Sequence, residues 1–203
     1  KKDRHNTKRI NPFFKDYGTL HYTIPFARIK TSDYEEAFME GIKRDDEEID
    51  KIISDTSEPT FDNTISRIDK EKGEHYYDLL DRVSNVFSCM LSADTNDEMD
   101  ELAQKLSPIL TKHSNDVSLN KKLFERIKYV HEHHRELTAE EQILLDKSYD
   151  GFVRSGALLN DADKDKLRKL TEESSMMSLQ FSQNLLKETK AYELHITNEE
   201  ELD

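Results

Sequence analysis

The chain has 203 residues, enough for one large domain that buries a sizeable core. Its formal net charge of −13 makes a nucleic-acid backbone or an anionic membrane surface an unfavourable partner, because both attract clustered Lys and Arg side chains. Charged residues make up 36% of the chain, with only 5 Gly and 4 Pro, which favours long surface helices and argues against a β-sandwich or a Rossmann-type sheet.

The N-terminal stretch divides into two parts. Residues 1–9 are polar and basic and are predicted to form a flexible lead-in. Residues 10–31 combine Pro12, Gly18 and Pro25 with many aromatic side chains. This composition predicts an extended arm that lies across the helices and is anchored by its rings.

The first helix is expected to begin at Ser32 or Asp33, either of which can cap it, and to run to about Ile53. Its apolar face carries Phe38, Ile42, Ile49, Ile52 and Ile53. The acidic run Asp45-Asp46-Glu47-Glu48 is interpreted as a solvated face.

The stretch Pro59–Asp97 is predicted to form a long central helix around which the chain is organised. Thr60, Asp62 or Asn63 can cap its start, and Gly73 weakens its first half. From Tyr76 onward the apolar residues recur in steps of three and four. Cys89 falls on this stripe and is interpreted as a small buried side chain, and a single cysteine allows no internal disulfide.

Three further helices are predicted after this stretch. Asn96 or Asp97 caps the first, in which Pro108 is expected to cause a kink because it removes a backbone donor. Asn120 starts a shorter helix that ends near His134. Thr138-Ala139-Glu140-Glu141 is a capping box that opens a helix ending at Gly156.

The longest helix is predicted from Asn160 or Asp161 to about Lys190. Its stripe consists of Leu167, Leu170, Met177, Phe181 and Leu185. Residues 192–196 alternate like a strand, and Thr197-Asn198-Glu199-Glu200 is a second capping box. A helix start so close to the last residue predicts that the chain is the N-terminal piece of a longer protein. Together these elements predict an all-α domain over residues 10–203, with long antiparallel helices.

One run of residues is a candidate metal-binding motif, His131-Glu132-His133-His134-Arg135. A zincin helix needs histidines at i and i+4 with Glu at i+1, and the i+4 position after His131 is Arg135. His131 and His134 could still meet at i and i+3, but structural zinc takes four protein ligands and catalytic zinc three. Histidines near a helix C-terminus are the preferred interpretation. The residues alone therefore indicate no catalytic, cofactor-binding or metal-binding residue, and no phosphate loop or Gly-x-Ser-x-Gly turn occurs.

Several motifs nevertheless follow one another in a characteristic order. They are Asn11-Pro12-Phe13-Phe14, Pro25-Phe26, Ile29-Lys30, Asp33-Tyr34, Pro59-Thr60-Phe61-Asp62-Asn63-Thr64, Arg82-Val83-Ser84-Asn85-Val86-Phe87, Ser92-Ala93-Asp94-Thr95-Asn96-Asp97, Phe152-Val153-Arg154-Ser155-Gly156-Ala157 and Gln180-Phe181-Ser182. From Asn11 onward the chain resembles the N-terminal region of a bacterial peptidyl-dipeptidase of the thimet oligopeptidase and neurolysin family of zinc metallopeptidases. The resemblance implies an almost entirely helical enzyme with two halves around a deep channel. It also implies that one zinc ion is held by an H-E-x-x-H helix and a further Glu in the C-terminal half, and none of these ligands maps onto this chain.

The resemblance implies that this part is a wall of the channel, inert alone, in an enzyme that releases C-terminal dipeptides with zinc-activated water. The partners it implies are the protein's own C-terminal catalytic domain and short peptide substrates. A free-standing helical interaction or scaffold module is the alternative, and a metalloprotein using His131 and His134 is a third, weaker hypothesis. The sequence has no recognisable signal peptide or membrane-spanning run, and both a cytoplasmic and a periplasmic location are compatible with it.

Overall fold

The computed structural model describes residues 9–69, 79–133 and 136–198, and within these ranges it contains helices and no β-strand. The predicted all-α fold class is therefore confirmed. The α-helices are α1 (Thr31–Ser54), α2 (Ser66–Asp69), α3 (Leu79–Ala93), α4 (Asp97–Ser118), α5 (Lys121–His133), α6 (Ala139–Arg154) and α7 (Asp161–Ala191). Three 3₁₀ turns precede them, η1 (Pro12–Phe14), η2 (Leu20–Tyr22) and η3 (Phe26–Arg28), and η4 (Phe61–Ile65) is a single π-helical turn before α2.

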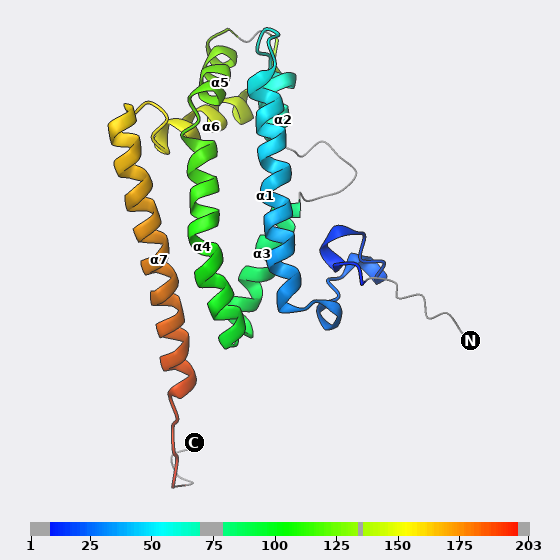
Figure 1. Cartoon of the computed structure of the whole chain (residues 1–203), viewed down its shortest axis with the longest axis vertical. Coiled ribbons are helices and arrows are strands. Elements are labelled where there is room, and N and C mark those ends of the chain that lie inside the picture. Colours follow the sequence, from blue (N-terminus) through cyan, green and yellow to red (C-terminus); the bar gives the residue numbers. More distant parts are fainter. Residues whose placement is uncertain (1–8, 70–78, 134–135, 199–203) are drawn as a thin grey trace, which may run out of the picture.

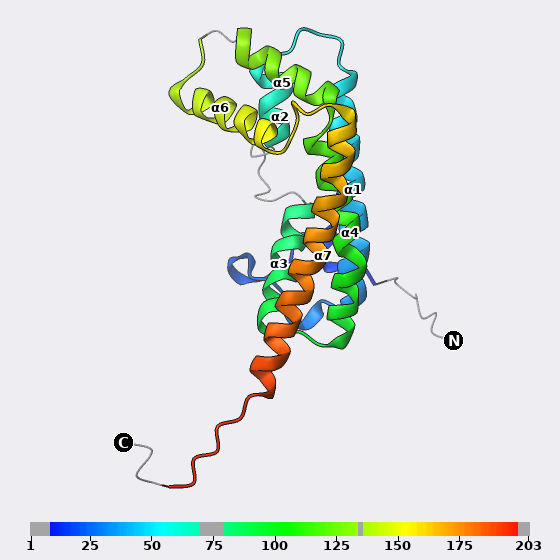
Figure 2. The same ribbon diagram turned by 90° about the vertical axis from the view of Figure 1, so that its left-hand side faces the viewer.

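The long helices lie roughly side by side, with α5 and α6 gathered at one end of the molecule (Figure 1). Along α1 and α4 the chain runs towards that end, and along α3 and α7 it runs away from it. The packed pairs α1–α3 and α4–α7 are therefore antiparallel, as predicted for the long helices. Figure 2 shows residues 192–198 leaving the helices beyond the C-terminal end of α7.

Helix α1 is shared by two hydrophobic cores. Its first half contributes Phe38 to a core with Phe87 of α3 and Leu106 of α4. Its second half contributes Ile52 to a core with η4, α5 and α6. Among the described elements the central one is thus α1, which packs against α3, α4 and α5, so the central position predicted for the helix over Pro59–Asp97 is wrong. Apolar periodicity shows which face of a helix is buried, but it does not show how many neighbours surround that helix.

The predicted helix starts are confirmed where a side chain accepts a hydrogen bond from the first turn. The side chain of Asn96 accepts from Met99 N at the start of α4, and that of Asn160 accepts from Asp163 N at the start of α7. Thr138 forms the predicted capping box with Glu141 before α6. These caps satisfy backbone N–H groups that have no partner within the helix.

Helix α1 begins at Thr31, so the predicted N-cap at Ser32 or Asp33 is wrong. Its N-cap is Lys30, and Asp33 lies at the third helical position, where its Oδ2 accepts from Lys30 N at 2.7 Å. Asp33 also holds Arg9, the last residue of the predicted lead-in, while residues 1–8 lie outside the described part of the chain. The acidic side chain therefore joins the arm to the first turn of α1.

The N-terminal arm is anchored by a few side chains only. Phe13 is fully buried in the first core, and Asn11 is buried where its Nδ2 donates to Asp33 O at 2.9 Å. The Nη2 of Arg82 in α3 donates to Phe13 O. Tyr22 and Phe26 instead remain exposed, so the arm is not held by all of its rings. Ile24 and Ile29 add contacts to the first core.

A capping box between Thr60 and Asn63 begins the helical segment that follows Pro59. Arg126 of α5 holds this connection, because its guanidinium donates to Asp55 O at 2.7 Å and to Asn63 Oδ1 at 3.1 Å. The predicted helix begins with the π turn η4, which runs directly into α2. Its continuation through Gly73 and Tyr76 lies outside the described residues and stays a prediction.

The turn between α6 and α7 depends on Gly156, as the predicted helix end requires. Its φ of +96° lies in the left-handed region that favours glycine. Gly156 N donates to Val153 O and Ala157 N donates to Phe152 O, both at 3.0 Å. This Schellman pair satisfies the last carbonyls of α6 and reverses the chain towards α7.

Two local expectations have different outcomes. Helix α4 continues through Pro108 as one helix, and the kink there stays a prediction. The strand predicted from the alternation at residues 192–196 is wrong, since these residues have no regular secondary structure. A strand requires a neighbour for its backbone hydrogen bonds, and no other described segment runs beside them.

Candidate functional site

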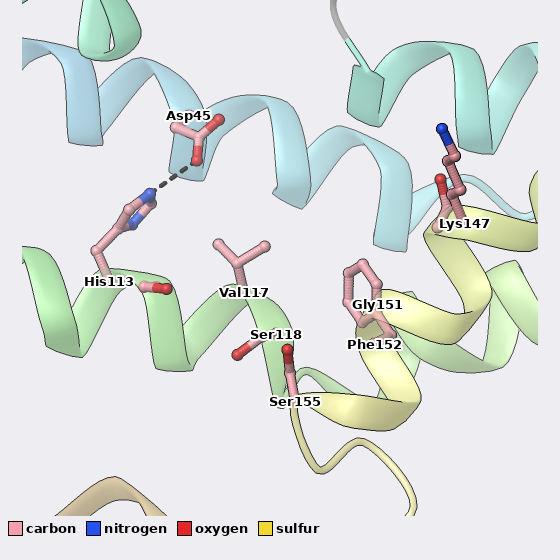
Figure 3. A pocket seen from close by; sticks show the side chains of 10 residues that line it. Asp45, His113, Val117, Ser118, Lys147, Gly151, Phe152 and Ser155 are labelled. Carbon is pink, nitrogen blue, oxygen red and sulfur yellow. Dashed lines mark hydrogen bonds and ion pairs between the residues drawn. The ribbon is translucent and has the colours of Figure 1, made fainter. Parts of the chain in front are cut away.

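A groove of about 460 Å³ lies where α6 approaches α1 and α4. Figure 3 shows Asp45 from α1, His113 and Ser118 from α4, and Lys147 and Phe152 from α6 around it. These residues are far apart in the sequence and meet only because α6 folds back across the ends of the two long helices.

The most constrained side chain of the groove is His113. Its Nε2 lies 2.7 Å from Asp45 Oδ2 and its Nδ1 lies 3.0 Å from Asp46 Oδ1, while the imidazole itself is only 9% exposed. Asp45 and Asp46 belong to the acidic run that sequence analysis assigned to a solvated face. That interpretation is wrong for Asp45, whose side chain is only 13% exposed, whereas Asp46 contacts His113 and still remains 57% exposed to solvent.

This geometry gives His113 a linking role and no role as a base. In a catalytic triad one imidazole nitrogen meets a carboxylate and the other meets the nucleophilic hydroxyl. Here both nitrogens face carboxylates, so neither is directed at Ser118 or another hydroxyl of the groove. These two contacts connect α4 to α1.

The two ends of the groove carry opposite charge. In Figure 3 Asp45 and Lys147 lie on opposite sides, with Val117 and the hydroxyls of Ser118 and Ser155 between them. A surface of this kind can hold a small polar molecule by charge and hydrogen bonds. It presents no activated nucleophile among the described residues.

The histidine considered as a metal ligand lies elsewhere. His131 stacks on Tyr149 of α6, with 4.1 Å between ring centroids and 9° between planes, and its Nε2 is 3.4 Å from Asp146 Oδ1. His134 lies outside the described residues. Among the residues that the structure describes, no group of three or more His, Cys, Asp and Glu side chains is arranged to hold a metal ion. The described side chains therefore do not fit the zinc site that the resemblance implies.

Cys89 is exposed on α3, so its assignment to the buried stripe is wrong. The buried face of α3 carries Val83, Val86 and Phe87. At about 100° per residue, Cys89 lies roughly 110° from the middle of that face, at the side of the helix. The next residue, Met90, does pack against the core.

The apolar stripe of α7 is present, but much of it faces away from the other described helices. Leu170, Met177, Phe181 and Leu185 are 61%, 67%, 70% and 58% exposed. The side of α7 that packs on α4 is mostly polar: Asn115 Nδ2 donates to Thr171 Oγ1 at 2.8 Å. Sequence analysis found the stripe but could not show which side of the helix meets α4.

The described residues form an all-α fold with a groove between α1, α4 and α6, and no group of His, Cys, Asp and Glu side chains among them is arranged to hold a metal ion. The chain is 36% identical over 184 residues to the dipeptidyl carboxypeptidase of Salmonella typhimurium, covering 89% of this chain and 26% of that protein. It is also 36% identical over 185 residues to the dipeptidyl carboxypeptidase of Escherichia coli, covering 90% of this chain and 26% of that protein.

These relatives confirm the resemblance to the peptidyl-dipeptidases that the order of motifs indicated. The chain spans about a quarter of the length of both relatives. No protein-family model matches it. In the described residues, no helix combines the length and the apolar character needed to cross a membrane.

Proposed function

We propose that this chain is the N-terminal part of a longer zinc metallopeptidase that releases C-terminal dipeptides from short peptides. The observation that carries the proposal is the 36% identity to two dipeptidyl carboxypeptidases over about nine-tenths of the chain. The matched quarter of those proteins leaves room for a separate catalytic part. The order of motifs from Asn11 to Ser182 supports the same assignment.

In this proposal the 203 residues supply a helical wall of the substrate channel and none of the zinc ligands. Two features support the proposal that these residues supply no zinc ligand. His131 is engaged with Asp146 and Tyr149, and both imidazole nitrogens of His113 are engaged with carboxylates. A wall of rigid helices would restrict access to short, unfolded peptides, and the catalytic domain of the same protein would be its main partner.

The test is a dipeptide-release assay on a blocked oligopeptide with added zinc. It compares the 203-residue chain with the complete product of its gene. We expect release by the complete product and none by the 203 residues alone. Release by the isolated chain would mean that it contains a catalytic site, and the variants His131→Ala and His113→Gln would then be assayed first. Absence of release from both proteins would reject the peptidase proposal and favour the scaffold module.

A further inference from the structure

The outward face of α7 is apolar, and no apolar side chains of the described residues cover it. Its four most exposed apolar residues are Leu170, Met177, Phe181 and Leu185. They follow one another at intervals of seven, four and four, so they form one continuous face about 22 Å long. This set is called the α7 stripe below.

The orientation of α7 is the reverse of that expected for a helix on the surface of an isolated domain. Such a helix normally turns its apolar side to the core and its polar side to water. Helix α7 packs on α4 through polar pairs, including Thr111 Oγ1 to Ser175 Oγ at 2.9 Å and Arg168 Nη1 to Asp116 Oδ1 at 2.6 Å. Leu179 of α7 also packs against the first core, so hydrogen bonds and this apolar contact together position α7, while the α7 stripe remains exposed.

From these observations, and on the basis of the proposed function, we infer that the α7 stripe is the docking surface for the remainder of the longer polypeptide. Contiguous exposed apolar patches on a soluble protein mark interaction sites. The remaining length is large, because the chain spans only 26% of its relatives. Residues 192–198 continue directly from the C-terminal end of α7, the helix that carries the stripe (Figure 2).

The chemistry of the stripe specifies the partner surface. It carries no charged side chain among its four members, so the segment that covers it must present apolar side chains of its own. A lipid surface is disfavoured by the net charge of −13. A second copy of this chain is the competing occupant, and the experiment below separates it from the inferred one.

The test is a double variant of the stripe, Met177→Glu with Phe181→Glu. Glu is a good helix former, so the change alters the face of α7 without opposing its helical conformation. The matched control is Gln180→Glu with Ser182→Glu, which adds the same two charges to the same turns at exposed positions outside the stripe. Both variants are made in the 203-residue chain and in the complete gene product, and thermal unfolding midpoints are measured by circular dichroism.

We expect both variants of the 203-residue chain to keep the wild-type midpoint within about 2 °C, because Met177 and Phe181 are exposed there. In the complete product we expect the stripe variant to lower the midpoint by about 4 °C or more and the control to leave it unchanged. An unchanged midpoint of the stripe variant in the complete product would overturn the inference. A wild-type 203-residue chain that sedimented as a dimer, and a complete product that kept this dimer contact, would overturn it in favour of a second copy.

The dipeptide-release assay on the wild-type complete product keeps this inference separate from the proposed function. Release together with an insensitive stripe would reject the docking surface and leave the peptidase proposal in place. A destabilised stripe variant in a protein that releases no dipeptide would support the docking surface and reject the peptidase proposal. A gene that encodes only these 203 residues would reject both.

Discussion

The guanidinium of Arg9 holds the carboxylate of Asp33 with two hydrogen bonds, Nη1 to Oδ1 at 2.6 Å and Nη2 to Oδ2 at 2.7 Å. Asp33 is almost completely buried, while Arg9 is partly open to solvent. The hydrogen bonds from Arg9 lower the pKa of the Asp33 carboxyl against the opposing effect of burial, and the backbone N–H of Lys30 adds to the lowering. A carboxylate in the first turn of α1 thus fastens the N-terminal arm to the bundle.

The first prediction concerns the pH dependence of this contact. Because the pKa of Asp33 is lower in the folded chain than in the unfolded chain, its contribution is present at neutral pH and is lost as the pH falls through the folded-state pKa. We expect Asp33→Asn to reduce the free energy of unfolding by about 1–3 kcal/mol at neutral pH. Urea denaturation at neutral pH and near pH 3 measures the difference from wild type, which should narrow in acid. A difference that is independent of pH would show that the charge of Asp33 does not stabilise the fold.

The second prediction concerns the link between α1 and α4. His113→Phe keeps an aromatic ring but removes both contacts to Asp45 and Asp46, and we expect it to cost about 1–3 kcal/mol of unfolding free energy. Lys112→Ala is the control, because the Lys112 side chain is 76% exposed where it pairs with Asp116, and it should cost less than about 1 kcal/mol. Equal costs of the two substitutions in urea denaturation would contradict the linking role of His113.

The third prediction compares two glycines inside helices. A Cβ on Gly41 would lie 3.0 Å from the backbone N and Cα of Leu80 in α3, whereas a Cβ on Gly151 would meet no atom within 4 Å. Alanine gains about 1 kcal/mol over glycine in a helix interior, so this gain is common to both positions. We expect Gly151→Ala to raise the thermal midpoint and Gly41→Ala to lower it, since overpacking costs about 1–3 kcal/mol. A stabilising Gly41→Ala would mean that α1 and α3 are not in such close contact.

The fourth prediction concerns the single thiol of the chain. Since Cys89 is exposed on α3, we expect a thiol reagent such as DTNB to label one thiol per native chain without denaturant. The rate of labelling should approach that of the urea-unfolded chain, and the Cys89→Ser variant should give no labelling signal. Labelling that appears only on unfolding would place Cys89 inside the core.

Helix starts and helix ends were predictable because they depend on a few consecutive residues. Asn96, Thr138 and Asn160 each cap a helix through a side chain that accepts from the backbone N–H three residues later. Gly156 ends α6 because its left-handed φ is costly for other residues. The fold class followed from the same local signals, together with the low content of Gly and Pro.

The contacts between helices were not predictable in this way. Nothing near Asp45 or His113 in the sequence shows that α1 and α4 bring these residues to 2.7 Å. Periodicity revealed the stripe of α7, but the choice of α4 as a neighbour depends on polar pairs such as Asn115 with Thr171, which are separated by 56 positions. The orientation of Cys89 was missed because a small side chain contributes little to the pattern.

The presence of two hydrophobic cores along α1 has a consequence for motion. One core gathers the N-terminal half of α1 with α3 and α4, and the other gathers its C-terminal half with η4, α5 and α6. Regions with separate apolar clusters open as separate cooperative units, each with its own free energy. We therefore expect the end formed by α5 and α6 to unfold locally at a different free energy from the end formed by α3, with α1 belonging to both units.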